Sequence, residues 1–256
     1  MAQTVFGLRN GEAVSFSLPD PDDIVLDAIP WGRHEAFFTP AYWASQTVMA
    51  SFRPADHRLG QTLHEEVAAC LLGGHGIPAE IGLAAFAHLR SMGLLEEGRL
   101  PTNRELHEAL TQPIRLGDRI VRYRFAAQKA SYLTSILKAL SYDKPPSDDL
   151  AFRDWFLTFK GVGPKTASWI ARNWLGSDNV AILDIHLHRA GLIAGIFSPK
   201  QTIQRDYFQM EQQFIRFARA LDVSPSHLDA VIWFQMKEAG NSVFPLLREI
   251  SPALAA

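Results

Sequence analysis

A glycine-rich turn that leads into a lysine carries the residue types in this sequence best suited to chemistry. The run Gly161-Val162-Gly163-Pro164-Lys165 precedes a helical pattern, so we expect Lys165 in the first turn of a helix. Glycines leave a turn without bulky side chains, and backbone N–H groups can then approach an anion such as phosphate. The positive end of a helix dipole disfavours an ammonium ion and favours the neutral amine. The pattern indicates a lysine nucleophile able to form a Schiff base, against the alternative of a solvated surface lysine.

A carboxylate follows nineteen residues after Lys165. Asp184 ends the apolar run 180–183, which we expect to be buried. Such a carboxylate either caps a helix or is held at a cleft as a functional group, and the two roles are compatible. His186 could donate a hydrogen bond to a phosphate oxygen. The lysine with an aspartate as its electrostatic partner suits an enzyme that binds a phosphate backbone and attacks the adjacent sugar carbon.

Two amphipathic patterns flank the glycine turn and must position it. Their apolar faces consist of Phe152, Trp155, Phe156 and Phe159 before the turn, and of Ala167, Ile170, Ala171 and Trp174 after it. This spacing predicts two helices. We expect Ser147 to cap the first helix, Pro164 to begin the second and Gly176 to end it. The segment therefore reads as helix, tight turn, helix.

The remainder of the chain is predicted to be mainly helical. Alternating residues on both sides of Asn10-Gly11 predict a β-hairpin between Val5 and Leu18. Helical spacing follows at about 63–71, 81–89, 132–140, 201–221 and 226–238. The clearest internal break is Lys144-Pro145-Pro146. We expect an all-α chain apart from the first hairpin.

Length and composition are ordinary for a globular protein. The 256 residues fit one large domain or two lobes. The single cysteine, Cys70, excludes an internal disulfide and a four-cysteine metal or iron–sulfur site. We expect a reducing, cytoplasmic setting and no membrane association, since no apolar run reaches membrane-spanning length. Metal chemistry is not expected either, because His186 and His188 would point to different faces of a helix.

The charge distribution is uneven along the chain. The formal net charge of −2 counts mildly against a nucleic-acid partner. One short window nevertheless carries five basic residues against the single acidic residue Asp118, and the basic residues are Arg115, Arg119, Arg122, Arg124 and Lys129. This window is either a solvated face or a patch that faces phosphates. Arg122 and Lys129 are our DNA-binding candidates in it.

The turn and the aspartate segment together resemble a known family. Gly161-Val162-Gly163-Pro164-Lys165-Thr166-Ala167 resembles the helix-hairpin-helix motif of the DNA glycosylase superfamily, and Leu183-Asp184-Ile185-His186 looks like its catalytic-aspartate segment. The Lys-to-Asp spacing and the histidine two residues later are most similar to the 8-oxoguanine DNA glycosylase/AP lyase branch. The motif resemblance covers about residues 150–190. The four-cysteine cluster of endonuclease III has no counterpart here.

The resemblance implies a mechanism for these residues. Lys165 would attack C1′ of the damaged nucleoside, and the Schiff base would permit β-elimination. Asp184 would stabilise the developing positive charge or assist deprotonation of Lys165. The hairpin backbone at Gly161, Val162 and Gly163 would hold a DNA phosphate, with a monovalent cation as the one cofactor to consider, and His186 would contact a neighbouring phosphate. The target base must leave the duplex first.

The resemblance also implies a two-lobed helical glycosylase fold with a cleft between the lobes. We expect residues 1–54 to form an N-terminal segment packed on the C-terminal lobe, residues 55–140 a helical lobe, and residues 141–256 the hairpin with the C-terminal helices. Aromatic candidates for a base pocket are Trp233, Phe234, Trp169 and Trp31, and polar candidates are Gln46, Gln235 and Lys237. Core packing is the alternative for each aromatic residue.

Several functions remain open at this point. The leading hypothesis is a monomeric enzyme that acts on damaged double-stranded DNA and excises an oxidised purine. A glycosylase for another damaged base is the nearest alternative. The hairpin could instead be a non-catalytic DNA-binding module, although phosphate binding alone does not need both Lys165 and Asp184. A globular protein without a nucleic-acid role is supported only by the net charge.

Overall fold

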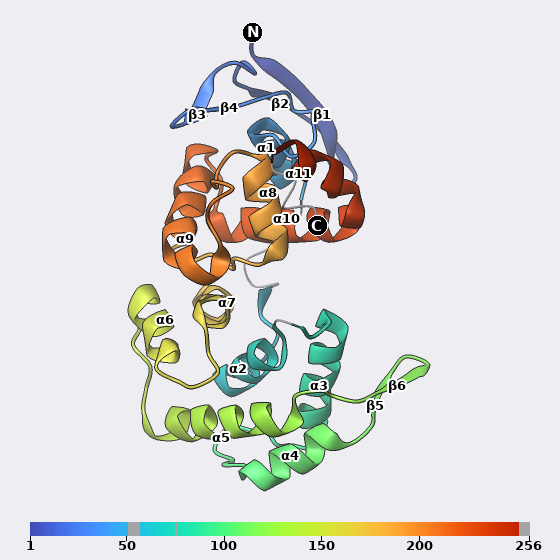
Figure 1. Cartoon of the computed structure of the whole chain (residues 1–256), viewed down its shortest axis with the longest axis vertical. Coiled ribbons are helices and arrows are strands. Elements are labelled where there is room, and N and C mark those ends of the chain that lie inside the picture. Colours follow the sequence, from blue (N-terminus) through green and yellow to red (C-terminus); the bar gives the residue numbers. More distant parts are fainter. Residues whose placement is uncertain (51–56, 75, 251–256) are drawn as a thin grey trace. The chain divides into compact units, whose positions relative to one another are not determined.

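The chain folds into two compact units, and the computed structural model describes residues 1–50, 57–74 and 76–250. The terminal unit combines residues 1–56 with residues 178–256, and the central unit consists of residues 57–177. The elements are mainly helical, as predicted (Figure 1). No helix in the described ranges has both the length and the apolar character needed to cross a membrane.

The central unit is a helical layer with one short β-ribbon. Its elements are α2 (Leu63–Leu72), α3 (Ala79–Ser91), α4 (Asn103–Thr111), β5 (Ile114–Leu116), β6 (Arg119–Val121), α5 (Ala126–Tyr142), α6 (Asp149–Leu157) and α7 (Pro164–Leu175). Side chains cap the first turns: Thr62 accepts a hydrogen bond at α2, and Thr102 forms a capping box with Glu105 at α4. The ribbon β5–β6 corrects the expectation of an all-α chain, because strands of three residues are too short to show a clear period-2 pattern.

A buried carboxylate joins α2 to α7 in this unit. Glu66 is fully buried, and its Oε2 accepts hydrogen bonds from the backbone N–H groups of Leu59 (2.7 Å) and Gly60 (2.9 Å). Its Oε1 accepts one from Nδ2 of Asn173 at 2.7 Å. These bonds satisfy a charge that would be costly to bury alone. The bond from Asn173 links α7 to α2, and the hairpin, which we expected in the C-terminal lobe, belongs to the central unit.

The helix-turn-helix reading of residues 147–176 is confirmed with one shift. The N-cap of α6 is Asp148 instead of Ser147, and its Oδ1 accepts hydrogen bonds from the N–H groups of Leu150 and Ala151. Two acceptor oxygens make the aspartate an equally good cap one residue later. Pro164 begins α7 as predicted, and Gly176 ends it in the left-handed conformation at φ 67°.

The terminal unit contains two β-hairpins and the remaining helices. Its elements are β1 (Gln3–Arg9), β2 (Glu12–Leu18), β3 (Ile24–Leu26), β4 (Ile29–Pro30), α1 (Pro40–Met49), α8 (Ile185–Ile193), α9 (Ile203–Ala220), α10 (Pro225–Ala239), a 3₁₀ turn (Gly240–Val243) and α11 (Phe244–Ile250). The predicted hairpin is confirmed: β1 pairs antiparallel with β2, and Asn10 and Gly11 both have positive φ. The short β3–β4 hairpin was not predicted.

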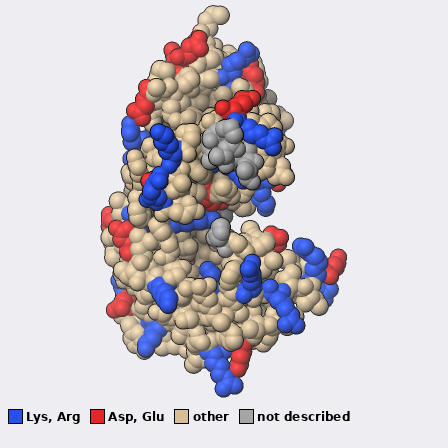
Figure 2. All heavy atoms as spheres, in the orientation of Figure 1, with Lys and Arg blue, Asp and Glu red and all other residues tan. Residues whose placement is uncertain are grey.

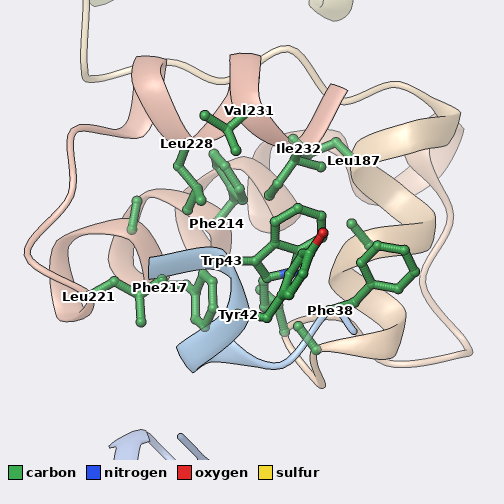
Figure 3. Close-up of a cluster of buried hydrophobic side chains, with 14 of the residues drawn as sticks. Phe38, Tyr42, Trp43, Leu187, Phe214, Phe217, Leu221, Leu228, Val231 and Ile232 are labelled. Atoms are coloured by element: carbon green, nitrogen blue, oxygen red, sulfur yellow. The ribbon is translucent and has the colours of Figure 1, made fainter. Parts of the chain in front are cut away.

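Aromatic residues of α1 lie at the centre of the terminal unit's core (Figure 3). Trp43 is fully buried and stacks on Phe38, with ring centroids 5.3 Å apart. Leu187 of α8, Phe214 and Phe217 of α9, and Leu228, Val231 and Ile232 of α10 belong to the same cluster. The N-terminal segment and the C-terminal helices therefore share one core, and this core anchors the first turn of α8.

Candidate active site

The turn before α7 leaves its backbone open on the central unit. Gly163 is the N-cap of α7 with extended φ/ψ of −96° and 175°, and no side chain caps the first turn. Gly161 and Gly163 are exposed, whereas Val162 between them is buried and donates its N–H to the carbonyl of Phe159 at 3.1 Å. Val162 therefore anchors the turn, and the flanking glycines expose a helix N-terminus of the kind that binds anions.

Gly161 is required by its own conformation and by its neighbour. Its φ of 89° lies in the region that L side chains rarely adopt. A Cβ at this position would lie 2.0 Å from Cδ2 of the Tyr132 ring. The ring of Tyr132 on α5 thus closes one side of the turn and fixes its path.

Lys165 is the second residue of α7, in the first turn as predicted, and it is half-buried. Its Nζ lies 5.9 Å from the ring centroid of Trp169, one helical turn further on. The Trp169 ring itself covers Gly73, where an added Cβ would lie 3.2 Å from ring Cζ3. Trp169, a predicted base-pocket residue, therefore supports Lys165 within the central unit.

Asp184 lies in the terminal unit and caps α8. Its Oδ1 accepts hydrogen bonds from the backbone N–H groups of His186 at 2.8 Å and Leu187 at 3.0 Å. The side chain is half-buried. The capping role expected from the sequence is confirmed, and it fixes one carboxylate oxygen of Asp184 in place.

Three side chains that the sequence reading missed hold the segment leading to Asp184. The buried run 180–183 belongs to no sheet, so its polar backbone groups need other partners. Glu211 accepts a hydrogen bond from the N–H of Ala181 at 3.0 Å, and Asp229 accepts one from Ile182 at 3.1 Å. The Tyr207 hydroxyl donates to the carbonyl of Ala181 at 2.9 Å and accepts from the N–H of Leu183 at 3.3 Å.

A recognisable signal marks these three residues in retrospect. Glu211 and Asp229 are nearly inaccessible carboxylates on the otherwise apolar faces of α9 and α10. A charged residue at a core-facing helical position needs a buried partner. The extended run 180–183 supplies these partners, because its backbone N–H groups have no neighbouring strand to bond to and donate to the two carboxylates instead.

Aromatic and polar residues surround His186 in the terminal unit. The His186 ring lies edge-on to Trp233, with centroids 6.2 Å apart, and Nζ of Lys237 lies 4.9 Å from the Trp233 ring centroid. Phe234, the next residue on α10, is 52% exposed, and its ring lies edge-on to Trp233 with centroids 6.1 Å apart. The structure thus brings together His186 and the base-pocket candidates Trp233 and Phe234.

The two candidate glutamines contact each other. Nε2 of Gln235 donates to Oε1 of Gln46 at 3.0 Å, and the Tyr42 hydroxyl donates to Oε1 of Gln235 at 3.2 Å. This chain of hydrogen bonds connects α10 to α1 and orients both amide groups. Whether either amide contacts a base stays a prediction.

Two predicted site residues have structural roles. Trp31 is 8% exposed and belongs to the core cluster of the terminal unit, which agrees with core packing, the alternative given for it above. Nζ of Lys129 donates to the carbonyl of Leu71 at 2.7 Å, at the C-terminal end of α2, and burial lowers the pKa of this ammonium. Arg122, by contrast, is exposed directly after β6.

A cavity of 510 Å³ in the terminal unit lies away from these residues. It is lined mainly by β3, β4, the end of α8 and part of α9, and none of the predicted site residues lines it. The candidate site residues are therefore the charged and aromatic groups described above, and their catalytic and binding roles stay predictions. Among the described residues, no group of three or more His, Cys, Asp or Glu side chains could hold a metal ion.

Comparison with solved structures defines the class of fold. The 8-oxoguanine DNA glycosylase of Thermotoga maritima matches with a TM-score of 0.54 and 27% identity, over 68% of this chain and 79% of that one. A Methanocaldococcus jannaschii 8-oxoguanine glycosylase/lyase, solved in complex with a 15-mer DNA containing 8-oxoguanine, matches with a TM-score of 0.54 and 24% identity, over 69% of this chain and 81% of that one. Both share the helical glycosylase fold.

Comparison of sequences gives the family. A family model described as 8-oxoguanine DNA glycosylase matches residues 46–223, and the chain belongs to this family. The 8-oxoguanine DNA glycosylase/AP lyase of Metallosphaera sedula is 32% identical over 120 residues, covering 44% of this chain and 57% of that protein. A Saccharolobus islandicus relative of the same name is 32% identical over 125 residues, covering 44% and 59%. The chain thus spans less than two thirds of the curated relatives it matches.

Proposed function

We propose that this protein is a bifunctional DNA glycosylase/AP lyase that excises 8-oxoguanine from double-stranded DNA in base excision repair. The observation that carries the proposal is the position of Lys165 in the first turn of α7, directly after the exposed backbone of Gly161 and Gly163. A phosphate held by this backbone would bring a neighbouring sugar toward the amine. Membership of the 8-oxoguanine DNA glycosylase family supports the same reaction.

The chemistry proceeds in two stages on a nucleotide flipped out of the duplex. First, the Lys165 amine forms a bond to C1′ while the N-glycosidic bond breaks, and the bonding electrons leave with the base, which takes up a proton. The C1′–O4′ bond of the sugar ring then breaks, O4′ takes up the proton that the amine releases, and a Schiff base forms between Nζ and C1′. This Schiff base loses a proton from C2′ and becomes an enamine. Its electrons expel the 3′ phosphate and break the C3′–O bond. Asp184 stabilises the positive charge at C1′ or accepts a proton from the amine.

The terminal unit supplies the groups that would recognise the base and the backbone. Phe234 is the more exposed of the two aromatic candidates, and the Trp233 ring lies near both His186 and Lys237. We assign His186 to a phosphate and the two aromatic rings to the flipped purine. Gln46 and Gln235, oriented by their mutual hydrogen bond, are the amides available for the base edge.

Three further parts of the proposal concern the setting of the reaction. A monovalent cation would link the hairpin carbonyl groups to the DNA phosphate, and affinity measured in potassium and in a bulky organic cation tests this. We propose that the protein acts as a monomer, which light scattering with and without DNA tests. An intracellular location follows from the proposed substrate.

Incision of a labelled duplex tests the proposed function. Wild-type protein should cut a duplex with one 8-oxoguanine, and Lys165→Gln should lower the rate by at least about 10³-fold while duplex affinity stays within a few-fold. Lys138→Gln, at an exposed lysine of α5 in the same unit, serves as the matched control. Incision of a different lesion instead would assign another base. Binding without any incision would favour the non-catalytic DNA-binding module.

A further inference from the structure

The ribbon β5–β6 projects from the central unit beyond α3 and α4 (Figure 1). Its register pairs Ile114 with Val121, Arg115 with Ile120 and Leu116 with Arg119. Directly paired residues share one face of a ribbon, and neighbouring pairs alternate between faces. Ile114, Leu116, Arg119 and Val121 therefore lie on one face, and Arg115 and Ile120 lie on the other.

The two faces differ in what they contact. Ile114 is buried, Leu116 and Val121 are half-buried, and β5 packs against α3. The apolar residues of this face account for the attachment of the ribbon to the unit. Ile120 on the opposite face is 76% exposed, so the fold does not use its side chain. Single exposed aliphatic residues are common on protein surfaces, so Ile120 gains significance only from the basic residues of the same ribbon.

Four arginines lie in the ribbon or within three residues after it, and the structure pairs none of them with a carboxylate in the described part of the chain. Arg115, Arg119, Arg122 and Arg124 are all exposed, and Asp118 is the one acidic residue among them. Figure 2 shows basic side chains gathered over the projecting ribbon. Other exposed arginines of this unit do bind carboxylates, as Arg99 binds Glu105 and Arg104 binds Glu108.

We propose that the β5–β6 ribbon is a DNA-contacting arm, with the arginines on backbone phosphates and Ile120 pressed into a groove. The inference rests on the proposed function for the identity of the nucleic acid. A two-stranded ribbon fits a DNA groove, and aliphatic side chains inserted there unstack bases and bend the duplex. Bending lowers the cost of base flipping, so the arm would assist capture of the damaged nucleotide.

Affinity for an 8-oxoguanine duplex, measured by fluorescence anisotropy over a series of salt concentrations, tests the arm. The double variant Arg115→Gln/Arg119→Gln should reduce the slope of log K against log salt by about 2, because each lost phosphate contact removes about 0.9. Ile120→Thr keeps a β-branched side chain, so it should preserve the ribbon. It should weaken binding about five-fold without a change of slope.

Matched controls on the same unit are Arg104→Gln and Leu100→Thr, since both residues are exposed and lie outside the ribbon. Wild-type affinity in both ribbon variants would overturn the arm, whether or not the protein cuts DNA. If the ribbon variants bound the DNA duplex normally but lost binding to RNA or to another protein, the proposed DNA-contacting arm would also be overturned. Failure of the glycosylase reaction in wild type, with duplex binding that still depends on the ribbon, would refute the proposed function alone.

Discussion

Glu211 accepts a hydrogen bond of 3.0 Å from the backbone N–H of Ala181, three residues before Asp184. This carboxylate on α9 works together with Asp229 on α10, which accepts from the next residue along the segment. Side chains therefore replace the neighbouring strand that an extended segment usually has. The position of Asp184 depends on two helices that are distant in sequence.

Loss of the Tyr207 hydroxyl should damage both stability and activity. Tyr207→Phe removes the group that donates to Ala181 and accepts from Leu183. Two buried backbone groups would lose a partner, and the free energy of unfolding should fall by about 1–3 kcal/mol. A shifted Asp184 should lower the single-turnover rate about ten-fold. Urea unfolding and rapid-quench kinetics measure the two effects.

Tyr142→Phe is the control for this change, because Tyr142 is 70% exposed. It should leave the free energy of unfolding and the rate at wild-type values. If Tyr207→Phe behaved like this control, the hydroxyl would not hold the segment and the positioning role would be wrong.

Replacing Asp184 by asparagine should separate its two roles. Asparagine caps a helix about as well as aspartate, so Asp184→Asn should change the free energy of unfolding by less than about 0.5 kcal/mol. The charge that stabilises C1′ would be lost, and base release should slow by about 10²–10³-fold. Thermal unfolding and product analysis under single-turnover conditions provide the two readouts.

Asp148→Asn is the matched cap variant, since Asp148 caps α6 through the same pair of backbone contacts. It should retain full activity. Equal rates for the two variants would show that Asp184 acts only as a helix cap.

Gly161→Ala should destabilise the protein more than the positive φ angle of residue 161 alone would. Gly176→Ala provides the comparison, because Gly176 also has positive φ, but an added Cβ there meets nothing within 4 Å. Gly176→Ala should lower the free energy of unfolding by about 1–2 kcal/mol, because alanine disfavours the left-handed backbone conformation. In Gly161→Ala the added Cβ also overlaps the Tyr132 ring, so the free energy of unfolding should fall by at least about 1–3 kcal/mol more than in the control. Chemical unfolding of both variants measures this difference, and equal losses would contradict the close contact.

Three buried or half-buried histidines should make the protein less stable in mild acid. Burial lowers the pKa values of His64, His188 and His227 below the ordinary value of 6.5. The unfolded chain therefore binds protons first as pH falls. Stability is fully present above about pH 6.5 and is lost as pH falls through the folded-state pKa values. The free energy of unfolding should thus decrease from pH 7.5 to 5.5.

His188→Gln isolates one of these groups. A single histidine changes the free energy of unfolding by at most about 1.4 kcal/mol per pH unit. The stability difference between wild type and His188→Gln should therefore be smaller at pH 5.5 than at pH 7.5. A difference that stays constant over this range would refute the contribution of His188.

Local signals in the sequence predicted the hairpin and the helix caps. Asn10-Gly11 specifies a turn with two positive φ angles, and Pro164 and Gly176 mark where α7 begins and ends. These features depend on residues a few positions apart. The ribbon β5–β6 was missed because its strands carry three residues each, and its basic residues could equally belong to a helix or a loop.

Long-range partners were the part that the sequence could not supply. Nothing local to Lys129 indicates that its ammonium reaches the carbonyl of Leu71, 58 residues earlier. Trp31 and Phe234 are both aromatic, yet one is in the core and the other is exposed. Chain packing decides such outcomes, so the roles of the aromatic residues could be assigned only from the fold.

Borohydride trapping tests the central claim, that Lys165 forms a Schiff base with C1′. Wild type should give a covalent protein–DNA adduct with an 8-oxoguanine duplex and with an abasic-site duplex, and Lys165→Gln should give neither. An adduct on the abasic duplex alone would keep the lyase chemistry and reject 8-oxoguanine as the substrate. Absence of an adduct on both duplexes, or an adduct that persists in Lys165→Gln, would contradict the mechanism.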